Sequence, residues 1–212
     1  MRPDSQSFFI FGKRIWRAIN RAKFSIFTVA GVYIFTVLAG MIMAGNGNHF
    51  ALSFRDQLVN QATIKDPSMI AEKNHESLKA GLLDFSENLT IGAIPLTISG
   101  FSVIFPFPLI AYQGWVGGIV SVRGDHSSRF DHWRSGFYYL STLILQLIPY
   151  SLTAGSGINV GIAMFRPASY YQDRKLLNLF PQEALLDLMR IYSLAVPLFL
   201  AASLWEFLSP WN

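Results

Sequence analysis

The sequence predicts an all-α fold: a polytopic transmembrane helix bundle with about five membrane passages, built as a single integral membrane domain over 1–212. Composition is the first observation, because 51% of the residues are hydrophobic and only 14% are charged, against about 25% charge in ordinary soluble domains. The second is the run 24–45, which carries no charge and follows a basic segment. Further apolar tracts occupy 89–122, 137–164 and 191–208. Such stretches must satisfy their own backbone hydrogen bonds in lipid, which favours helices.

The chain begins with a basic segment, 1–23, in which apolar residues recur at helical spacing. This pattern predicts an amphipathic helix at the membrane surface, with a plain basic flank as the alternative. Its membrane-surface residues are Lys13, Arg14, Trp16, Arg17 and Arg21. The run 24–45 is long enough for a span of roughly 20 residues and too long for the apolar region of a signal peptide, roughly 7 to 15 residues. The basic flank predicts a cytoplasmic N-terminus.

The next segment, 46–88, turns polar and is predicted to be an outside loop. Its scattered Leu and Ile residues indicate short amphipathic helices, with a break near Pro67. The segment could cover the end of the bundle or receive a partner protein.

The tract 89–122 is interrupted at 105–108 by two prolines, each of which removes a backbone donor. It is therefore predicted to be a helical hairpin, either two short spans or one re-entrant pair. Both arrangements return the chain to the outside, so 123–136 is expected to be a second outside loop. The three arginines of that loop run against the positive-inside tendency.

The remaining chain is expected to cross the membrane twice. A kinked, tilted or partly unwound span is predicted for 137–164, because it contains Pro149. An inside loop, 165–190, with an interfacial helix near 182–189, precedes the last span, 191–208. The predicted location is a bacterial cytoplasmic (inner) membrane, with the C-terminus outside.

Few side chains in the sequence carry recognisable chemistry. The chain has no Cys, which excludes disulfides and sulfur-ligated metals, and it has no nucleophile elbow, phosphate-binding glycine loop or zinc-binding helix motif. Asp125, His126, Asp131 and His132 match no known metal spacing, so a solvated loop is the preferred interpretation. No catalytic residue, cofactor or metal is predicted. The net positive charge is expected to attract anionic lipid headgroups rather than nucleic acid.

Two sets of residues inside the apolar tracts are predicted to matter. Small residues spaced four apart allow close helix contacts, within the chain or with a partner: Gly40, Ala44, Gly114, Gly118, Gly157 and Gly161. Polar side chains inside a membrane are energetically costly, so those that occur there often have a functional role. The intramembrane polar residues are Asn88, Gln113, Gln146, Thr153, Asn159 and Glu206. Glu206 lies near a span end, where it either serves a function or reaches interfacial water.

Four short motifs occur in an order that resembles the stage II sporulation protein M family of bacterial integral membrane proteins. They are 84–89 (DFSENL), 112–118 (YQGWVGG), Pro149 and 201–207 (AASLWEF). The resemblance implies that Asn88, Gln113, Gly114, Gly118 and Glu206 correspond to family positions. The family's Pro-His-Gly stretch and the Glu after it are reduced here to Pro149, so no role of that His or Glu is carried over.

The resemblance and the scarcity of chemistry predict a noncatalytic scaffold or accessory subunit. Its expected partners are other membrane or envelope proteins, or copies of itself, together with lipid. The alternative is a permease or transporter subunit, because broken helices place helix ends and free carbonyls at a midplane site. A pigment-binding accessory role is a third reading, although the aromatic residues are more typical of lipid anchors and packing.

Overall fold

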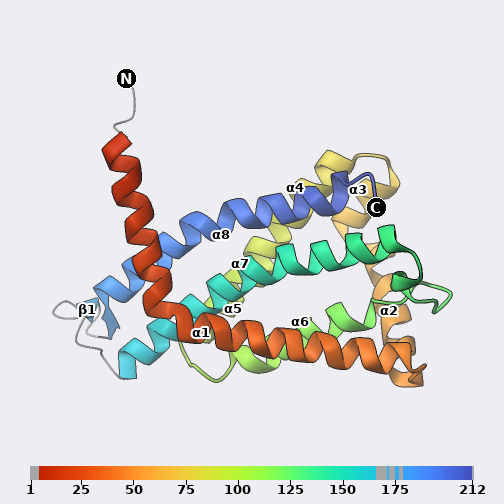
Figure 1. The fold of residues 1–212 in the computed structure, drawn as a ribbon, viewed down its shortest axis with the longest axis horizontal. Coiled ribbons are helices and arrows are strands. Elements are labelled where there is room, and N and C mark those ends of the chain that lie inside the picture. Colours follow the sequence, from red (N-terminus) through yellow and green to blue (C-terminus); the bar gives the residue numbers. More distant parts are fainter. Residues whose placement is uncertain (1–4, 166–170, 172–174, 177–178, 212) are drawn as a thin grey trace.

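The computed structural model describes residues 5–165, 171, 175–176 and 179–211. Helices dominate this part of the chain, and most of them run along one long axis (Figure 1). Three of them are long and apolar enough to cross a membrane: α1 within Ile10–Gly45, α7 (Trp133–Phe165) and α8 (Gln182–Leu208). The chain is therefore a helical protein with the features of a membrane protein.

The first helix, α1 (Ser5–Gly45), is continuous through the boundary predicted at residue 24. Figure 1 shows that its first part turns away from the axis of the bundle and that the remainder lies along it. No Pro or Gly breaks the helix near the turn, since Gly12 and Gly31 are the nearest glycines. The predicted surface and spanning segments are thus parts of one helix, and the interfacial position of the first part stays a prediction.

The polar segment after α1 forms three short helices: α2 (His49–Lys65), α3 (Pro67–Lys73) and α4 (Ser77–Glu87). The break falls at Pro67, as the sequence indicates. Asp66 ends α2, and its side chain accepts hydrogen bonds from the backbone N–H groups at the start of α3, which is the usual role of an N-cap residue.

The predicted hairpin has a longer first arm than the sequence suggested. The α4 helix continues through a π-helical segment, η1 (Asn88–Ala93), into α5 (Ile94–Gly100) without a break. The chain then reverses, and Val103 adopts a positive φ of 68° in the turn. The second arm, α6 (Pro106–Ile119), begins with a proline in its first turn, where no backbone donor is required.

The α7 helix starts four residues earlier than the predicted span. A short 3-10 helix, η2 (Arg129–Asp131), and an isolated bridge between Val122 and Ser128 precede it, so the predicted loop 123–136 is shorter than expected. The helix remains α-helical through Pro149, which makes the predicted partial unwinding wrong. Thr153 donates a hydrogen bond to the Pro149 carbonyl at 2.9 Å.

The segment between α7 and α8 contains a two-stranded antiparallel pairing of β1 (Lys175–Leu176) with β2 (Phe180–Pro181), which the all-α prediction did not include. The α8 helix begins at Gln182 and continues to Leu208. The helix predicted near 182–189 is present, but it is continuous with the predicted last span, 191–208, and forms the first turns of one long helix. Its interfacial position stays a prediction. The rest of the predicted inside loop lies partly outside the described residues.

The middle of the bundle is closely packed around α7. Every residue of 151–161 on this helix is buried, and the predicted small residues lie against neighbouring helices of the same chain. Gly40 meets Gly118, Gly114 meets Tyr33, and Gly157 meets Thr97. Gly161 meets Phe101, and Ala44 belongs to a buried cluster with Ala51, Ile119 and Val122.

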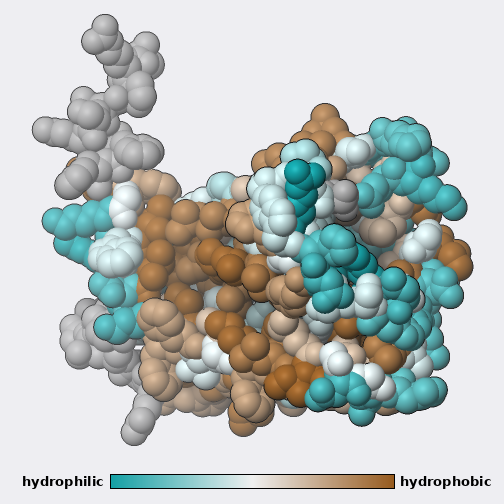
Figure 2. Space-filling model, turned by 45° about the vertical axis from the view of Figure 1, so that its right-hand side comes forward, coloured by the Kyte–Doolittle hydropathy of each residue, from teal (hydrophilic) through white to brown (hydrophobic). Residues whose placement is uncertain are grey.

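The surface separates into an apolar middle and polar ends. Figure 2 shows a broad hydrophobic band between hydrophilic side chains at the two ends of the visible face. Exposed aromatic residues on α1 include Phe24 (79% exposed) and Phe27 (73%). A water-soluble protein of this size rarely exposes so large an apolar surface, and a lipid-facing surface accounts for it.

Candidate functional site

A cavity of about 460 Å³ lies at the end of the bundle where α7 begins and α6 and α8 end. We call this the cavity end. Volumes of roughly 300 to 1,000 Å³ are typical of small-molecule sites. The lining residues come from α1, α3, η1, α6, η2, α7 and α8: Tyr33, Met69, Glu72, Asn88, Tyr112, Gln113, Val116, Gly117, Val120, Arg129, Tyr138, Tyr139, Thr142, Leu143, Gln146, Tyr150, Glu206 and Phe207.

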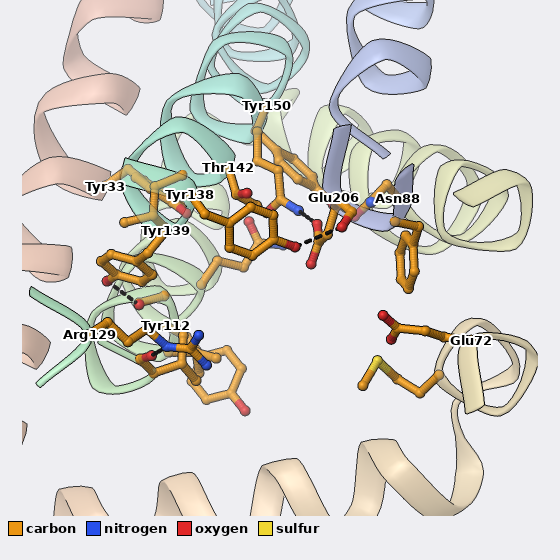
Figure 3. Close-up of a pocket in the computed structure, with 18 residues that line it drawn as sticks. Tyr33, Glu72, Asn88, Tyr112, Arg129, Tyr138, Tyr139, Thr142, Tyr150 and Glu206 are labelled. Atoms are coloured by element: carbon orange, nitrogen blue, oxygen red, sulfur yellow. Dashed lines mark hydrogen bonds between the residues drawn. The ribbon is translucent and has the colours of Figure 1, made fainter. Parts of the chain in front are cut away.

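Glu206 places a carboxylate on the wall of this cavity, close to the end of α8. Its Oε2 accepts a hydrogen bond from Gln146 Nε2 on α7 at 2.7 Å. Its backbone carbonyl accepts one from the Tyr138 hydroxyl, also at 2.7 Å (Figure 3). The last carbonyls of a helix have no partner within the helix, so Tyr138 stabilises the end of α8 while the carboxylate faces the cavity.

A second hydrogen-bonded chain leads from α7 across η1 to α4. The Tyr150 hydroxyl donates to Asn88 Oδ1 at 2.7 Å, and Asn88 Nδ2 donates to Asp84 Oδ2 at 2.8 Å. Asp84 lies in the polar segment of the chain, where burial raises the pKa of its carboxyl. The π-helical turn begins at Asn88, and such turns are frequent at functional sites.

Tyrosine rings form much of the remaining wall, and Figure 3 shows those of Tyr33, Tyr112, Tyr138, Tyr139 and Tyr150 around the cavity. The Tyr139 hydroxyl donates to the Gly117 carbonyl at 2.7 Å. Since this bond and the two described above occupy hydroxyl groups, they hold three of the rings in fixed positions. The π-face of a fixed tyrosine attracts cations.

The charges of the lining are predominantly negative. Glu72 lies across the cavity from Glu206 in Figure 3, and Arg129 is the one cationic side chain among the lining residues. Arg129 Nε donates to the Val120 carbonyl at 2.8 Å, and burial lowers the pKa of its guanidinium. The wall therefore combines two carboxylates with one guanidinium and several tyrosine rings.

The structure brings together four of the six polar residues singled out in the sequence. Asn88, Gln113, Gln146 and Glu206 line the cavity. Thr153 does not, because it is fully buried against the Pro149 carbonyl. Asn159 also lies elsewhere, where its Nδ2 donates to the Tyr171 hydroxyl at 2.7 Å.

Sequence reasoning missed the tyrosines, Arg129 and Glu72. A signal was present on α7, where Tyr139, Thr142, Gln146 and Tyr150 recur at spacings of three and four. This spacing puts them on one face of a helix. A row of polar and aromatic side chains inside an apolar tract indicates a helix face that lines a polar cavity. Arg129 and Glu72 offered no such signal, because they reach the cavity from separate loop helices.

The loop cluster of Asp125, His126, Asp131 and His132 does not converge. His126 Nε2 lies 3.0 Å from Asp56 Oδ2, and Asp125 accepts hydrogen bonds from Ser127. Within the described part of the chain, no group of three His, Asp or Glu side chains is arranged to hold a metal ion. Arg55 and His126 lower the pKa of Asp56.

The opposite end of the bundle carries the predicted basic residues, and we call it the arginine end. The sequence predicts that Arg21 lies at the membrane surface. In the structure, Arg21 also forms ion pairs with Asp187 and Glu183 on α8. Arg190 binds the same two carboxylates at 2.8 Å and 2.7 Å. Lys13, Arg14, Trp16 and Arg17 are exposed.

Comparison with known proteins adds no relative to this description. No family model, no curated protein and no solved structure matches the chain. The resemblance to the stage II sporulation protein M family therefore stays an expectation from the sequence, and the cavity must be interpreted from its own chemistry.

Proposed function

We propose that this protein is an integral membrane subunit that binds a small organic cation in the cavity, as part of a permease or transporter. The observation that carries the proposal is the placement of the Glu206 carboxylate among fixed tyrosine rings. A carboxylate supplies the counter-charge for a cation, and aromatic faces favour a quaternary or substituted ammonium group. This develops the alternative hypothesis from the sequence, a permease or transporter subunit, and Gln113 and Gln146 of the polar residues singled out there line the cavity with Glu206.

The closed side of the cavity supports a transport role. Toward the arginine end, the bundle is filled by the buried stretch 151–161 of α7. Gly155 packs on Ile26 there, and Gly157 packs on the Thr97 backbone. Small residues at such contacts let the helix backbones approach closely, so the cavity is closed on this side. Alternating access would then open this glycine contact while the cavity end closes.

Binding is tested on the purified full-length protein in mild detergent with choline as the probe. Its uncharged isostere, 3,3-dimethylbutanol, is the ligand control, because it has the same shape without the charge. We expect choline to bind, measured by titration calorimetry, and the isostere to bind at least tenfold more weakly. Equal binding of the two ligands, or binding of neither, contradicts the proposal.

The variant Glu206→Gln tests the role of the carboxylate. Glutamine keeps the size of the side chain and retains an acceptor for Gln146. We expect choline affinity to fall about tenfold or more, equivalent to about 1.4 kcal/mol or more, because the neutral amide removes the counter-charge for the ammonium group. Glu76→Gln is the matched control, since Glu76 is an exposed residue paired with Lys79 outside the cavity.

Transport is tested separately from binding. The protein is reconstituted into liposomes, and uptake of labelled choline is followed with and without an imposed membrane potential. Uptake that Glu206→Gln reduces and Glu76→Gln leaves unchanged supports a permease. Specific binding without uptake would restrict the protein to a solute-binding subunit.

A scaffold or accessory role remains a second candidate because of the outer face of the loop helices. Large apolar side chains are exposed there, outside the three candidate spans, including Phe50 (61% exposed), Ile64 (70%) and Leu78 (59%). Crosslinking in native membranes would test this role. A defined partner that is lost with Ile64→Asn and Leu78→Asn, but retained with Glu206→Gln, would favour the scaffold.

A further inference from the structure

A second pocket lies at the arginine end, and we propose that it binds the phosphate headgroup of an anionic phospholipid. It has a volume of about 290 Å³ and is lined by Arg14, Arg17, Arg21, Glu183 and Arg190. This inference is independent of the proposed cation cavity, which lies at the other end of the bundle.

Two helices assemble the pocket. Arg14, Arg17 and Arg21 follow one another on α1 at spacings of three and four residues, which places them on one helix face. Arg190 and Glu183 come from the first turns of α8. The sequence predicted a general attraction of the α1 residues to anionic lipid, whereas the structure adds Arg190 and a concave site.

The charge balance leaves room for an anion. Arg21 and Arg190 share the carboxylates of Asp187 and Glu183. Arg14 and Arg17 form no ion pair with any other residue that the structure describes. The pocket therefore keeps an excess of about two positive charges, from two guanidinium groups whose fork geometry suits phosphate oxygens.

The ion pairs also hold the pocket in shape. Asp187 has a side chain that is 1% exposed, and it lies between Arg21 and Arg190. Fixing these two guanidinium groups reduces the conformational entropy lost when an anion binds. In an arginine cluster without such ion pairs, every side chain would lose conformational entropy when the anion binds.

The surroundings favour a phospholipid over free phosphate. Directly after Arg21, α1 exposes Phe24 and Phe27 on the apolar surface, where acyl chains would lie below the headgroup. Trp16, 64% exposed, lies between Arg14 and Arg17 in the sequence, and tryptophan prefers the headgroup level of a membrane. A soluble phosphate would gain nothing from this apolar surface.

The test uses native mass spectrometry of the full-length protein in detergent, titrated with phosphatidylglycerol. Phosphatidylcholine, which is zwitterionic, is the lipid control, and inorganic phosphate is added as a competitor. We expect one phosphatidylglycerol molecule to be retained preferentially, with no displacement by millimolar phosphate. Equal retention of both lipids, or displacement by inorganic phosphate, would overturn the proposal.

The double variant Arg14→Gln/Arg17→Gln removes the two uncompensated charges. We expect its affinity for phosphatidylglycerol to fall about 30-fold, equivalent to about 2 kcal/mol at about 1.4 kcal/mol per tenfold. Lys13→Gln/Lys23→Gln is the matched control, because it removes the same charge from exposed positions of α1 that do not line the pocket.

Comparison of the two double variants separates a site from general attraction. A loss confined to the arginine variant supports the pocket, whereas an equal loss in both variants overturns it. All four substituted side chains are exposed, so both proteins are expected to fold. Thermal unfolding in detergent serves as the check, because the melting temperature should be unchanged in either variant.

Discussion

The two ends of the bundle place a carboxylate in opposite surroundings. At the arginine end, Asp187 lies between two guanidinium groups and has little capacity left for a ligand. At the cavity end, Glu206 accepts a hydrogen bond from the neutral amide of Gln146 and faces an open volume. The difference indicates that the first carboxylate holds helices together, whereas the second is available to a cation.

The largest predicted effect tests the structural carboxylate. Asp187→Asn should lower the free energy of unfolding by about 3 kcal/mol, because it removes one partner from a buried ion-pair network. Chemical denaturation in detergent measures this change. Glu76→Ala is the control and should cost less than about 1 kcal/mol, since its pair with Lys79 is exposed. If Glu206→Gln proved as destabilising as Asp187→Asn, the proposed contrast would be lost.

The next effect concerns the closed region between the two ends. Gly157→Ala should destabilise the protein by about 2 kcal/mol, because the added methyl group would meet the Thr97 backbone. Gly31→Ala is the control: its added methyl group would have no neighbouring atom within 4 Å, and alanine favours a helix over glycine by about 1 kcal/mol. Equal stability of both variants would mean that the glycine contact is loose.

A smaller effect sharpens the assignment of Glu206. Protons and cations compete for the same carboxylate, so choline affinity should fall as the pH is lowered, by at most about tenfold per pH unit for one proton. Calorimetric titration at several pH values measures the slope. The slope should disappear in Glu206→Gln and persist in Glu76→Gln. A slope that survives in Glu206→Gln would assign the proton competition to another group.

The smallest predicted effect compares two carboxylates in the loop helices. Arg55 and His126 lower the pKa of Asp56 from its ordinary value of 3.8, so its stabilising contribution is present above that value and is lost as the pH falls below it. Burial raises the pKa of Asp84, so its contribution is present below 3.8 and is lost as the pH rises through the higher folded-state value.

Asp56→Asn and Asp84→Asn should therefore change the pH dependence of the melting temperature in opposite directions. Asp56→Asn should remove part of the acid sensitivity, whereas Asp84→Asn should remove part of the loss of stability at higher pH. Thermal unfolding between pH 3 and pH 8 measures both. Shifts of the same sign would contradict the difference in environment between the two carboxylates.

Local features of the chain were readable from the sequence. The hydrocarbon-length runs predicted long helices, and Pro67 and the prolines at 105–108 marked helix breaks. These features depend on hydropathy and on backbone geometry within a few residues. For the same reason the sequence indicated which polar residues stood out in apolar tracts, including Gln146 and Glu206.

Boundaries between segments were less well predicted. Charge changes suggested that helices end near residues 23, 88 and 190, yet α1, the α4–α5 run and α8 continue through those points. A change from polar to apolar residues marks a change of surroundings, but a helix keeps its own hydrogen bonds in both. Hydropathy therefore predicted the presence of the long helices more accurately than the residues at which they begin and end.

The sequence by itself determined a helical chain with the composition of a membrane protein and a small set of unusual polar residues. Only the tertiary structure decided which of them meet: it joined Glu206 to Gln146, separated Thr153 and Asn159 from them, and paired Arg21 with Asp187. The physical reason is that helix formation depends on neighbours along the chain, whereas a cavity or an ion pair depends on the packing of helices far apart in sequence.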